Sequence, residues 1–141
     1  MAGAGNNQKS SAGAEILKLG RMYMKDAGKS EMESDYIAAE GIYHMCCDLF
    51  SSLIQKKSSY ETEAKGEYMH ALFRYAMLPQ IKEAEKMQYL DQAFELAAQL
   101  EQETGDVEYT IAVGCIQEEM EGLDRSLKHR TREKQEEALL F

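Results

Sequence analysis

Residues 31–57 read EMESDYIAAEGIYHMCCDLFSSLIQKK, and this stretch decides the fold. One apolar set within it recurs at alternating steps of three and four residues: Tyr36, Ala39, Tyr43, Cys46, Phe50 and Leu53. That spacing lines one face of an α-helix, so the sequence predicts a single long helix here. A second apolar set lies off this line and comprises Ile37, Ala38, Ile42, Met45, Leu49 and Ile54. A helix that is apolar on two sides needs cover on both, which predicts neighbouring helices on either side.

Composition extends this expectation to the whole chain. The 141 residues suffice for one domain with a single core, and 44% of them are hydrophobic. Good helix formers dominate, whereas valine occurs only at Val107 and Val113 and proline only at Pro79. Such a shortage of β-branched residues argues against a sheet. We therefore expect an all-α fold of about five antiparallel helices.

The net charge of −9 is unevenly distributed along the chain. Residues 1–124 carry 22 acidic and 11 basic side chains, whereas residues 125–141 carry 3 acidic and 5 basic ones. An acidic body repels nucleic acid and anionic membranes, so neither is expected as a partner. The expected partner is a protein or peptide that is basic or that binds through apolar contacts.

No targeting or membrane segment is apparent in the sequence. No apolar run approaches the roughly 20 residues of a membrane span, and residues 1–13 lack the apolar centre of a signal peptide. The three cysteines form no spaced pairs of the kind found in disulfide frameworks. We expect a soluble cytoplasmic protein, either a monomer or a homodimer.

Turn and cap residues divide the chain into segments. Residues 1–13 are expected to form a disordered tail, residues 14–127 an all-α helical-hairpin domain, and residues 128–141 a charged extension with an apolar tip. Gly28 is predicted to end the first helix, and Ser30 with Glu33 to form a capping box for the second. Pro79 should end the third helix, and Gly105 should cap the fourth.

The predicted first helix contains the pattern Ile16-x-x-Leu19-Gly20-x-x-Tyr23, and the predicted second helix contains Tyr36-x-x-Ala39. These residues resemble the signature of a tetratricopeptide repeat. Weaker copies begin near Phe73 and Val113, with Leu90-x-x-Ala93 between them. The second copy of the pattern follows the first after 54 residues, and the third follows the second after 40 residues, whereas the standard repeat is 34 residues long. A plain five-helix bundle is the alternative.

The resemblance implies a superhelix of helical hairpins whose concave face binds a peptide or helix. We therefore expect an adaptor, scaffold or chaperone-like protein, with no enzymatic activity and no cofactor. The first helix of each hairpin would line the groove, which on this chain implies three positions in each of three helices: Leu17, Arg21 and Met24; Ala71, Tyr75 and Leu78; Ile111, Cys115 and Glu118.

Tyr75 is the residue from which we expect the most binding energy. It follows Arg74 in a helix whose main stripe is filled by other apolar residues, so it is expected to be only partly covered. Tyrosine offers a large contact area and loses little rotamer entropy on binding. Arg21 would supply a neighbouring charge for a carboxylate of the bound peptide.

A metal-dependent helical-bundle enzyme is the alternative function. Glu67-x-x-His70 has the spacing of di-iron bundle ligands, and Glu40 with His44 would form a second pair. The simpler interpretation is two surface pairs of carboxylate and imidazole. Cys46 belongs to the apolar stripe, and adjacent cysteines on a helix point about 100° apart, so metal binding at Cys46 and Cys47 is not expected.

Overall fold

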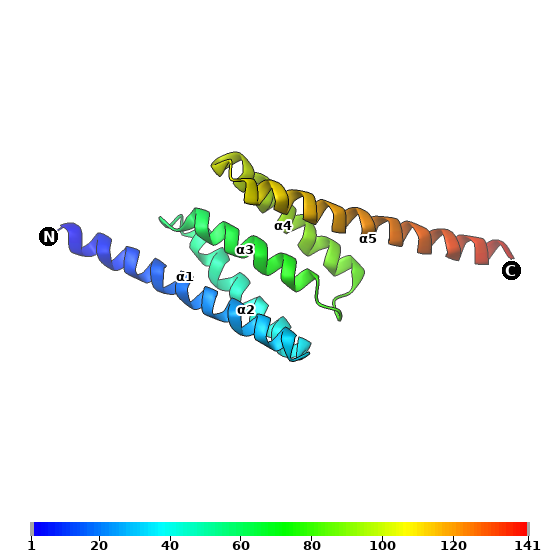
Figure 1. Cartoon of the computed structure of the whole chain (residues 1–141), viewed down its shortest axis with the longest axis horizontal. Helices are drawn as coiled ribbons and strands as arrows, with labels where there is room; N and C mark the ends of the chain where they lie inside the picture. The colour runs from blue at the N-terminus through cyan, green and yellow to red at the C-terminus, as the bar shows by residue number, and fades with distance from the viewer. Residues whose placement is uncertain (1, 141) are drawn as a thin grey trace.

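The structure is a computed structural model that describes residues 2–140, with the side chains of residues 2–11, 130, 131 and 134 excepted. Five helices make up this part of the chain, as Figure 1 shows: α1 (Ala2–Met32), α2 (Tyr36–Gln55), α3 (Glu61–Ala76), α4 (Glu83–Thr104) and α5 (Val107–Leu140). The predicted all-α fold of about five helices is confirmed.

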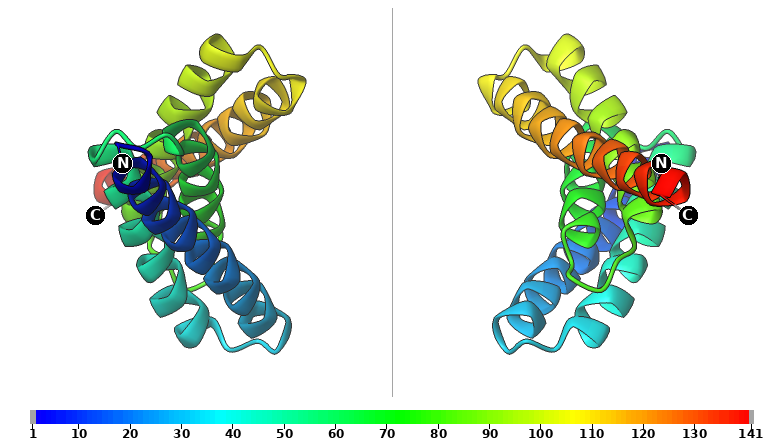
Figure 2. Two further views of the ribbon diagram at one scale, coloured as in Figure 1. Left: turned by 90° about the vertical axis from the view of Figure 1, so that its left-hand side faces the viewer. Right: turned by 90° about the vertical axis from the view of Figure 1, so that its right-hand side faces the viewer.

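The helices pack in chain order. Each packs on the next one along the chain, and α1 also makes a smaller contact with α3. In Figure 1, α3 lies between the two outermost helices, α1 and α5, and Figure 2 shows the α1–α2 and α4–α5 hairpins splayed away from it on opposite sides. Among residues 2–140, no helix combines the length and the apolar character needed to cross a bilayer.

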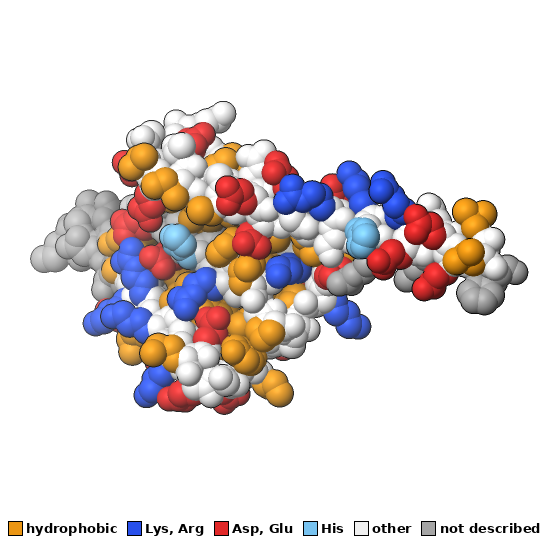
Figure 3. Space-filling model, turned by 45° about the vertical axis from the view of Figure 1, so that its right-hand side comes forward, with side chains coloured by type: hydrophobic (Ala, Val, Ile, Leu, Met, Phe, Trp, Pro, Cys, Tyr) orange, Lys and Arg blue, Asp and Glu red, His pale blue; other side chains and the backbone are white. Residues whose placement is uncertain are grey.

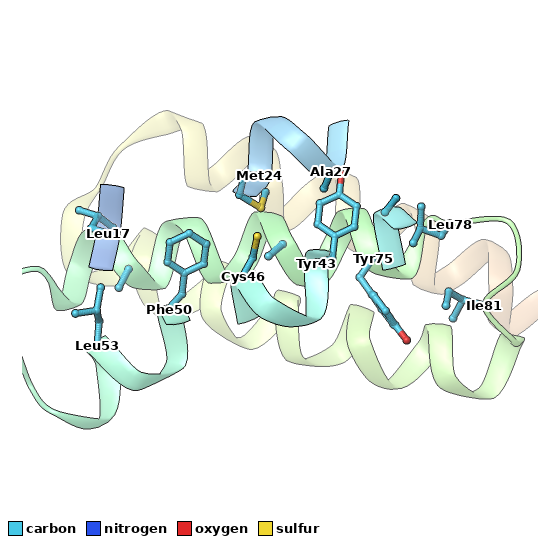
Figure 4. Packing of buried hydrophobic residues seen from close by; sticks show 13 residues of the cluster. Leu17, Met24, Ala27, Tyr43, Cys46, Phe50, Leu53, Tyr75, Leu78 and Ile81 are labelled. Carbon is cyan, nitrogen blue, oxygen red and sulfur yellow. The ribbon is translucent and has the colours of Figure 1, made fainter. Parts of the chain in front are cut away.

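Two apolar clusters form the core, and α3 contributes to both. The first joins α1, α2 and α3 and contains the fully buried Tyr43 and Phe50, as Figure 4 shows. The second joins α3, α4 and α5 and is centred on Leu72, Leu90 and Ile116. Cover on both sides of α2, by α1 and α3, agrees with its two apolar sets.

Two members of the second apolar set of α2 are not covered. Ile37 is 82% exposed and Met45 is 45% exposed. The expectation that this set is buried is therefore wrong at these two positions. Ile37 lies in the first turn of α2, directly after the turn that joins α1 to α2.

Close packing of α1 on α2 depends on a glycine. A Cβ placed at Gly20 would overlap the ring of Phe50, and that ring is completely buried. Gly20 also lies beside Cys46, whose thiol donates a 3.7 Å hydrogen bond to the Gly20 carbonyl. The absence of a side chain at position 20 thus lets Phe50 fill the space between the two helices.

The predicted boundary between the first two helices is wrong. α1 continues through Gly28 and Ser30 to Met32, and the turn lies at residues 33–35. Ser34 there has a positive φ of 59°, and the side chain of Asp35 accepts the Ala38 N–H at 3.2 Å as the true N-cap of α2. Tertiary contacts explain the difference at Gly28, because an Arg74 guanidinium nitrogen lies 3.1 Å from where its Cβ would be.

The N-terminal segment also differs from the expectation. α1 begins at Ala2, so residues expected to form a disordered tail are helical, although the side chains before Ala12 lie outside the description. At Gly13 this helix passes close to α3, since an added Cβ would lie 3.0 Å from the ring of Tyr60.

Gly105 ends α4 in the left-handed conformation that the sequence predicts. Its φ is 69°, and its N–H donates to the Glu101 carbonyl at 2.9 Å. A residue with a Cβ is strained in this conformation, so Gly105→Val is expected to lower the free energy of unfolding by about 1 kcal/mol or more. Urea denaturation measures the difference. The matched control is Gly41→Ala, within α2 in open space, which should raise stability by about 0.5–1 kcal/mol.

Candidate functional site

An apolar groove lies between α3 and α5, both of which pack on α4. It encloses about 260 Å³ and is lined by Met69, His70, Phe73, Glu108, Ile111, Ala112, Cys115 and Ile116. We refer to these eight residues as the α3–α5 groove. Figure 3 shows hydrophobic side chains gathered on this face of the molecule, beneath α5.

The floor of the groove belongs to the core, and its wall does not. Met69 and Ile116 are buried at 1% and 2% exposure, and they anchor the two helices to the second core cluster. Ile111 on the α5 wall is 60% exposed, which is unusual for an isoleucine beside a cavity. Cys115, one turn further along α5, presents a free and exposed thiol.

The width of the groove is set at the start of α5. Tyr109 packs on Gly66 of α3, where an added Cβ would lie 3.0 Å from the tyrosine hydroxyl oxygen. Burial, more than the nearby carboxylate of Glu108, raises the pKa of Tyr109. Because Gly66 has no side chain, the Tyr109 hydroxyl reaches α3 and closes this end of the groove.

The rim of the groove carries a single polar pair among the described residues that line it. Nε2 of His70 lies 3.7 Å from a carboxylate oxygen of Glu108, and the two side chains are 46% and 68% exposed. An exposed pair of this kind contributes little to stability. It leaves an acidic group at the mouth of an otherwise apolar cavity when His70 is neutral.

Of the nine residues that the sequence assigns to partner binding, two line this groove, namely Ile111 and Cys115. Glu118 is exposed on α5 beyond them. Arg21 lies elsewhere, on α1, where its guanidinium forms ion pairs with Glu63 at 3.4 Å and Glu67 at 3.3 Å across to α3.

The other five assigned residues are buried in the first core cluster: Leu17, Met24, Ala71, Tyr75 and Leu78. They therefore hold the fold together and present no surface to a partner in this structure. The groove residues of α3 that the assignment misses are Met69, His70 and Phe73. They lie on a face of α3 turned away from the one predicted, and helical periodicity alone does not say which partly apolar face is left open.

Tyr75 is 3% exposed, so the expectation of partial cover is wrong. Its hydroxyl donates to a carboxylate oxygen of Glu85 at 3.0 Å, and Nε2 of His44 lies 3.1 Å from the same hydroxyl. The rings of His44 and Tyr89 pack edge-on against it, with centroids at 4.6 and 4.5 Å. Burial, followed by the hydrogen bond to Glu85, raises the pKa of Tyr75. Tyr75 thus ties α2 and α4 to α3.

A second polar cluster fastens the first three helices together. The Tyr43 hydroxyl donates to a carboxylate oxygen of Glu31, and the Arg74 guanidinium pairs with the same oxygen at 3.2 Å. Arg74 also lies over the Tyr43 ring, 5.5 Å from its centroid. Burial raises the pKa of Tyr43, and the Glu31 contact adds to this effect. Glu31 thus contacts both Tyr43 and Arg74, and Arg74 contacts Tyr43.

The four residues of the alternative metal site do not converge. His44 bonds Tyr75, Glu67 pairs with Arg21, and His70 lies beside Glu108. Among the residues described, no group of three or more histidine, cysteine, aspartate or glutamate side chains is placed to hold a metal ion. Burial raises the pKa of Cys46 to about 11 and that of Cys47 to about 12, which keeps both thiols protonated near neutral pH.

Fold and groove together define a protein built of consecutive antiparallel helices, with an apolar groove between two helices that are not neighbours in the chain. Comparison of the chain with protein-family models, with curated proteins and with solved structures found no match.

Proposed function

We propose that this protein is a protein–protein interaction module, and that the α3–α5 groove binds the apolar face of a partner helix or peptide. One observation carries the proposal: the groove is lined almost entirely by apolar side chains, yet Ile111 on its wall is 60% exposed. Concave apolar sites with a few polar groups at the rim are the usual form of binding sites in proteins.

The size and charge of the groove suggest the kind of partner. A cavity of roughly 150 Å³ admits a benzene-sized molecule, so 260 Å³ accommodates at least one large aliphatic or aromatic side chain. An amphipathic helix places such side chains in a groove at steps of three and four residues. Glu108 at the rim and the acidic body favour a partner with basic residues beside its apolar face.

The architecture supports this assignment by analogy. α1, α3 and α5 occupy the places of the first helices of successive hairpins, and a groove between such helices is where tetratricopeptide-like proteins bind their partners. We extend the tetratricopeptide-like interpretation to this chain on that basis, with an adaptor, scaffold or chaperone-like role in the cytoplasm.

A displayed library of helix-forming peptides tests the binding proposal. Peptides are selected on the wild-type protein alone, and their affinity is then measured for the Ile111→Asp variant, which places a charge in the groove wall. We expect the retained peptides to share apolar residues at steps of three and four with basic residues alongside, and to lose about tenfold or more in affinity for the variant.

Ile37→Asp is the matched control, because Ile37 is 82% exposed and belongs to α2, away from the groove. Peptides that depend on the groove should bind this variant as they bind the wild type. Selected peptides that bind the Ile111→Asp variant with unchanged affinity, while circular dichroism shows both variants folded, would overturn the groove as the binding site.

A further inference from the structure

The second half of α5 leaves the body of the molecule and ends in exposed apolar residues. Residues 128–140 continue the helix beyond the hairpin, and Figures 1 and 3 show this extension projecting from the body. Leu139 and Leu140 are 87% and 81% exposed. Water contact with two adjacent leucines is unfavourable, so the tip gains free energy from any apolar surface that covers it.

Charge divides α5 into two opposite halves. Residues 107–124 contain five acidic side chains and no basic ones, whereas residues 125–140 contain five basic side chains and three acidic ones. Two such helices placed side by side in the same direction bring like charges together. Placed in opposite directions, each basic half lies against the acidic half of the other, so α5 is complementary to itself only in the antiparallel arrangement.

A row of exposed residues on α5 is also complementary to itself when two copies of the helix run in opposite directions. Five exposed residues spaced by seven form one row along the helix, which turns by about 20° at each step, in the order Ile111, Glu118, Arg125, Arg132 and Leu139. The order is apolar, acidic, basic, basic, apolar. In an antiparallel pair with Leu139 beside Ile111, the same register places Arg132 of each copy beside Glu118 of the other.

We propose that two copies of this chain associate through antiparallel α5 helices, with the apolar tip of each α5 covering the α3–α5 groove of the other. The tip cannot reach its own groove, because 28 residues of one continuous helix separate Leu139 from Ile111 and span about 42 Å. The pairing is two-fold symmetric, so each copy supplies a tip and a groove, and the assembly closes as a dimer.

The central contact of this arrangement brings the two Arg125 side chains close to the two-fold axis. The carboxylates of Glu121 and Asp124, which flank position 125 on both copies, offset that repulsion. Gly122 is partly covered by its own Arg125, whose guanidinium lies 4.0 Å from where a Cβ would be. The missing side chain at Gly122 leaves room beside it for the second helix.

The mass of the full chain in solution tests the association. Sedimentation equilibrium at low ionic strength should give twice the chain mass of 16.0 kDa for the wild type. Leu139→Asp and Ile111→Asp should each raise the dissociation constant about tenfold or more, since each puts a charge into the apolar contact. Ile37→Asp makes the same change at another exposed isoleucine and should leave the constant unchanged. A monomeric wild type, or equal disruption by Ile37→Asp, overturns the proposal.

A charge exchange tests the antiparallel register. Arg132→Glu and Glu118→Arg should each weaken the dimer alone, because each sets like charges opposite one another in both symmetric pairs. An equimolar mixture of the two variants should associate again, since every facing pair is then of opposite charge. Both positions are exposed, so each variant should keep the helicity and melting temperature of the wild type. A mixture no stronger than the separate variants overturns this register.

This inference rests on the proposed function, because both involve the α3–α5 groove. Different experimental results overturn each of the two proposals. Glu118 and Arg132 do not line the groove. A monomeric wild type that still selects groove-dependent peptides overturns the dimer alone. A dimer that passes the charge exchange, and whose Leu139→Asp variant with an uncovered groove selects no groove-dependent peptide, overturns the binding of a foreign helix alone.

Discussion

Replacing Phe50 with alanine is expected to lower the free energy of unfolding by about 3–5 kcal/mol, as removal of a buried aromatic ring does in other cores. Phe50 has no exposed surface, and its ring lies in the first core cluster, between α1 and α2. The ring is held against Gly20, so the neighbouring backbone would have to move for the cavity to close. A cavity that cannot collapse brings the cost toward the upper end of this range.

Chemical denaturation followed by circular dichroism measures this loss. Met45→Ala on the same helix is the control, because Met45 is 45% exposed and its truncation should cost well under about 1 kcal/mol. If Phe50→Ala and Met45→Ala proved equally mild, the packing of α1 on α2 described above would be wrong.

Truncation of Tyr75 to alanine is expected to cost about 3–5 kcal/mol of stability, the other large effect. The change removes a ring that packs against His44 and Tyr89, and it leaves the Glu85 carboxylate without its hydroxyl donor. Tyr75→Phe keeps the ring and loses only the hydroxyl, so about 1–3 kcal/mol is expected for it. Because Tyr75 is buried, loss of stability should precede any loss of partner affinity.

The pH dependence of unfolding gives a second measurement of Tyr75. Its pKa is raised in the folded state, so the folded protein holds the phenol proton more tightly than the unfolded chain does. This stability is fully present below pH 10, the approximate pKa of tyrosine in an unfolded chain, and it decreases as the pH rises further. The Tyr75→Phe variant should lose less stability than the wild type over that alkaline range. Parallel curves would show that Tyr75 does not titrate as its surroundings imply.

Features that depend on neighbouring residues were predictable from the sequence. The step of three and four residues placed six residues of α2 on one face, and five of them are buried: Ala39, Tyr43, Cys46, Phe50 and Leu53. Gly105 was identifiable as a cap because a left-handed residue at a helix end favours glycine whatever lies around it.

Features that depend on distant residues were not predictable in the same way. Gly28 and Ser30 have the local character of a helix end, yet α1 runs through them. Arg74 reaches this part of α1 from α3, pairs with Glu31 and lies against Gly28. A contact between residues so far apart in the chain leaves no trace in local spacing.

The candidate site was predictable only on α5. Ile111 and Cys115 were assigned to the groove through the repeat resemblance, and they line it. On α3 the same reasoning selected Ala71 and Tyr75, which face the first core cluster. α3 has apolar residues around most of its circumference because it contributes to both clusters. Its open face is therefore decided by how far α5 lies from it, and that distance is a property of the assembled helices.

Packing in chain order has a consequence for local unfolding. The two core clusters share α3, while α1 contributes only to the first, α2 contributes to the second only through Cys47, and α4 and α5 contribute mainly to the second. Detachment of α5 would expose the second cluster and leave the first intact, so opening can proceed from the ends of the chain inward. Backbone amides of α3 would then exchange with solvent hydrogen last, and those in the projecting half of α5 first.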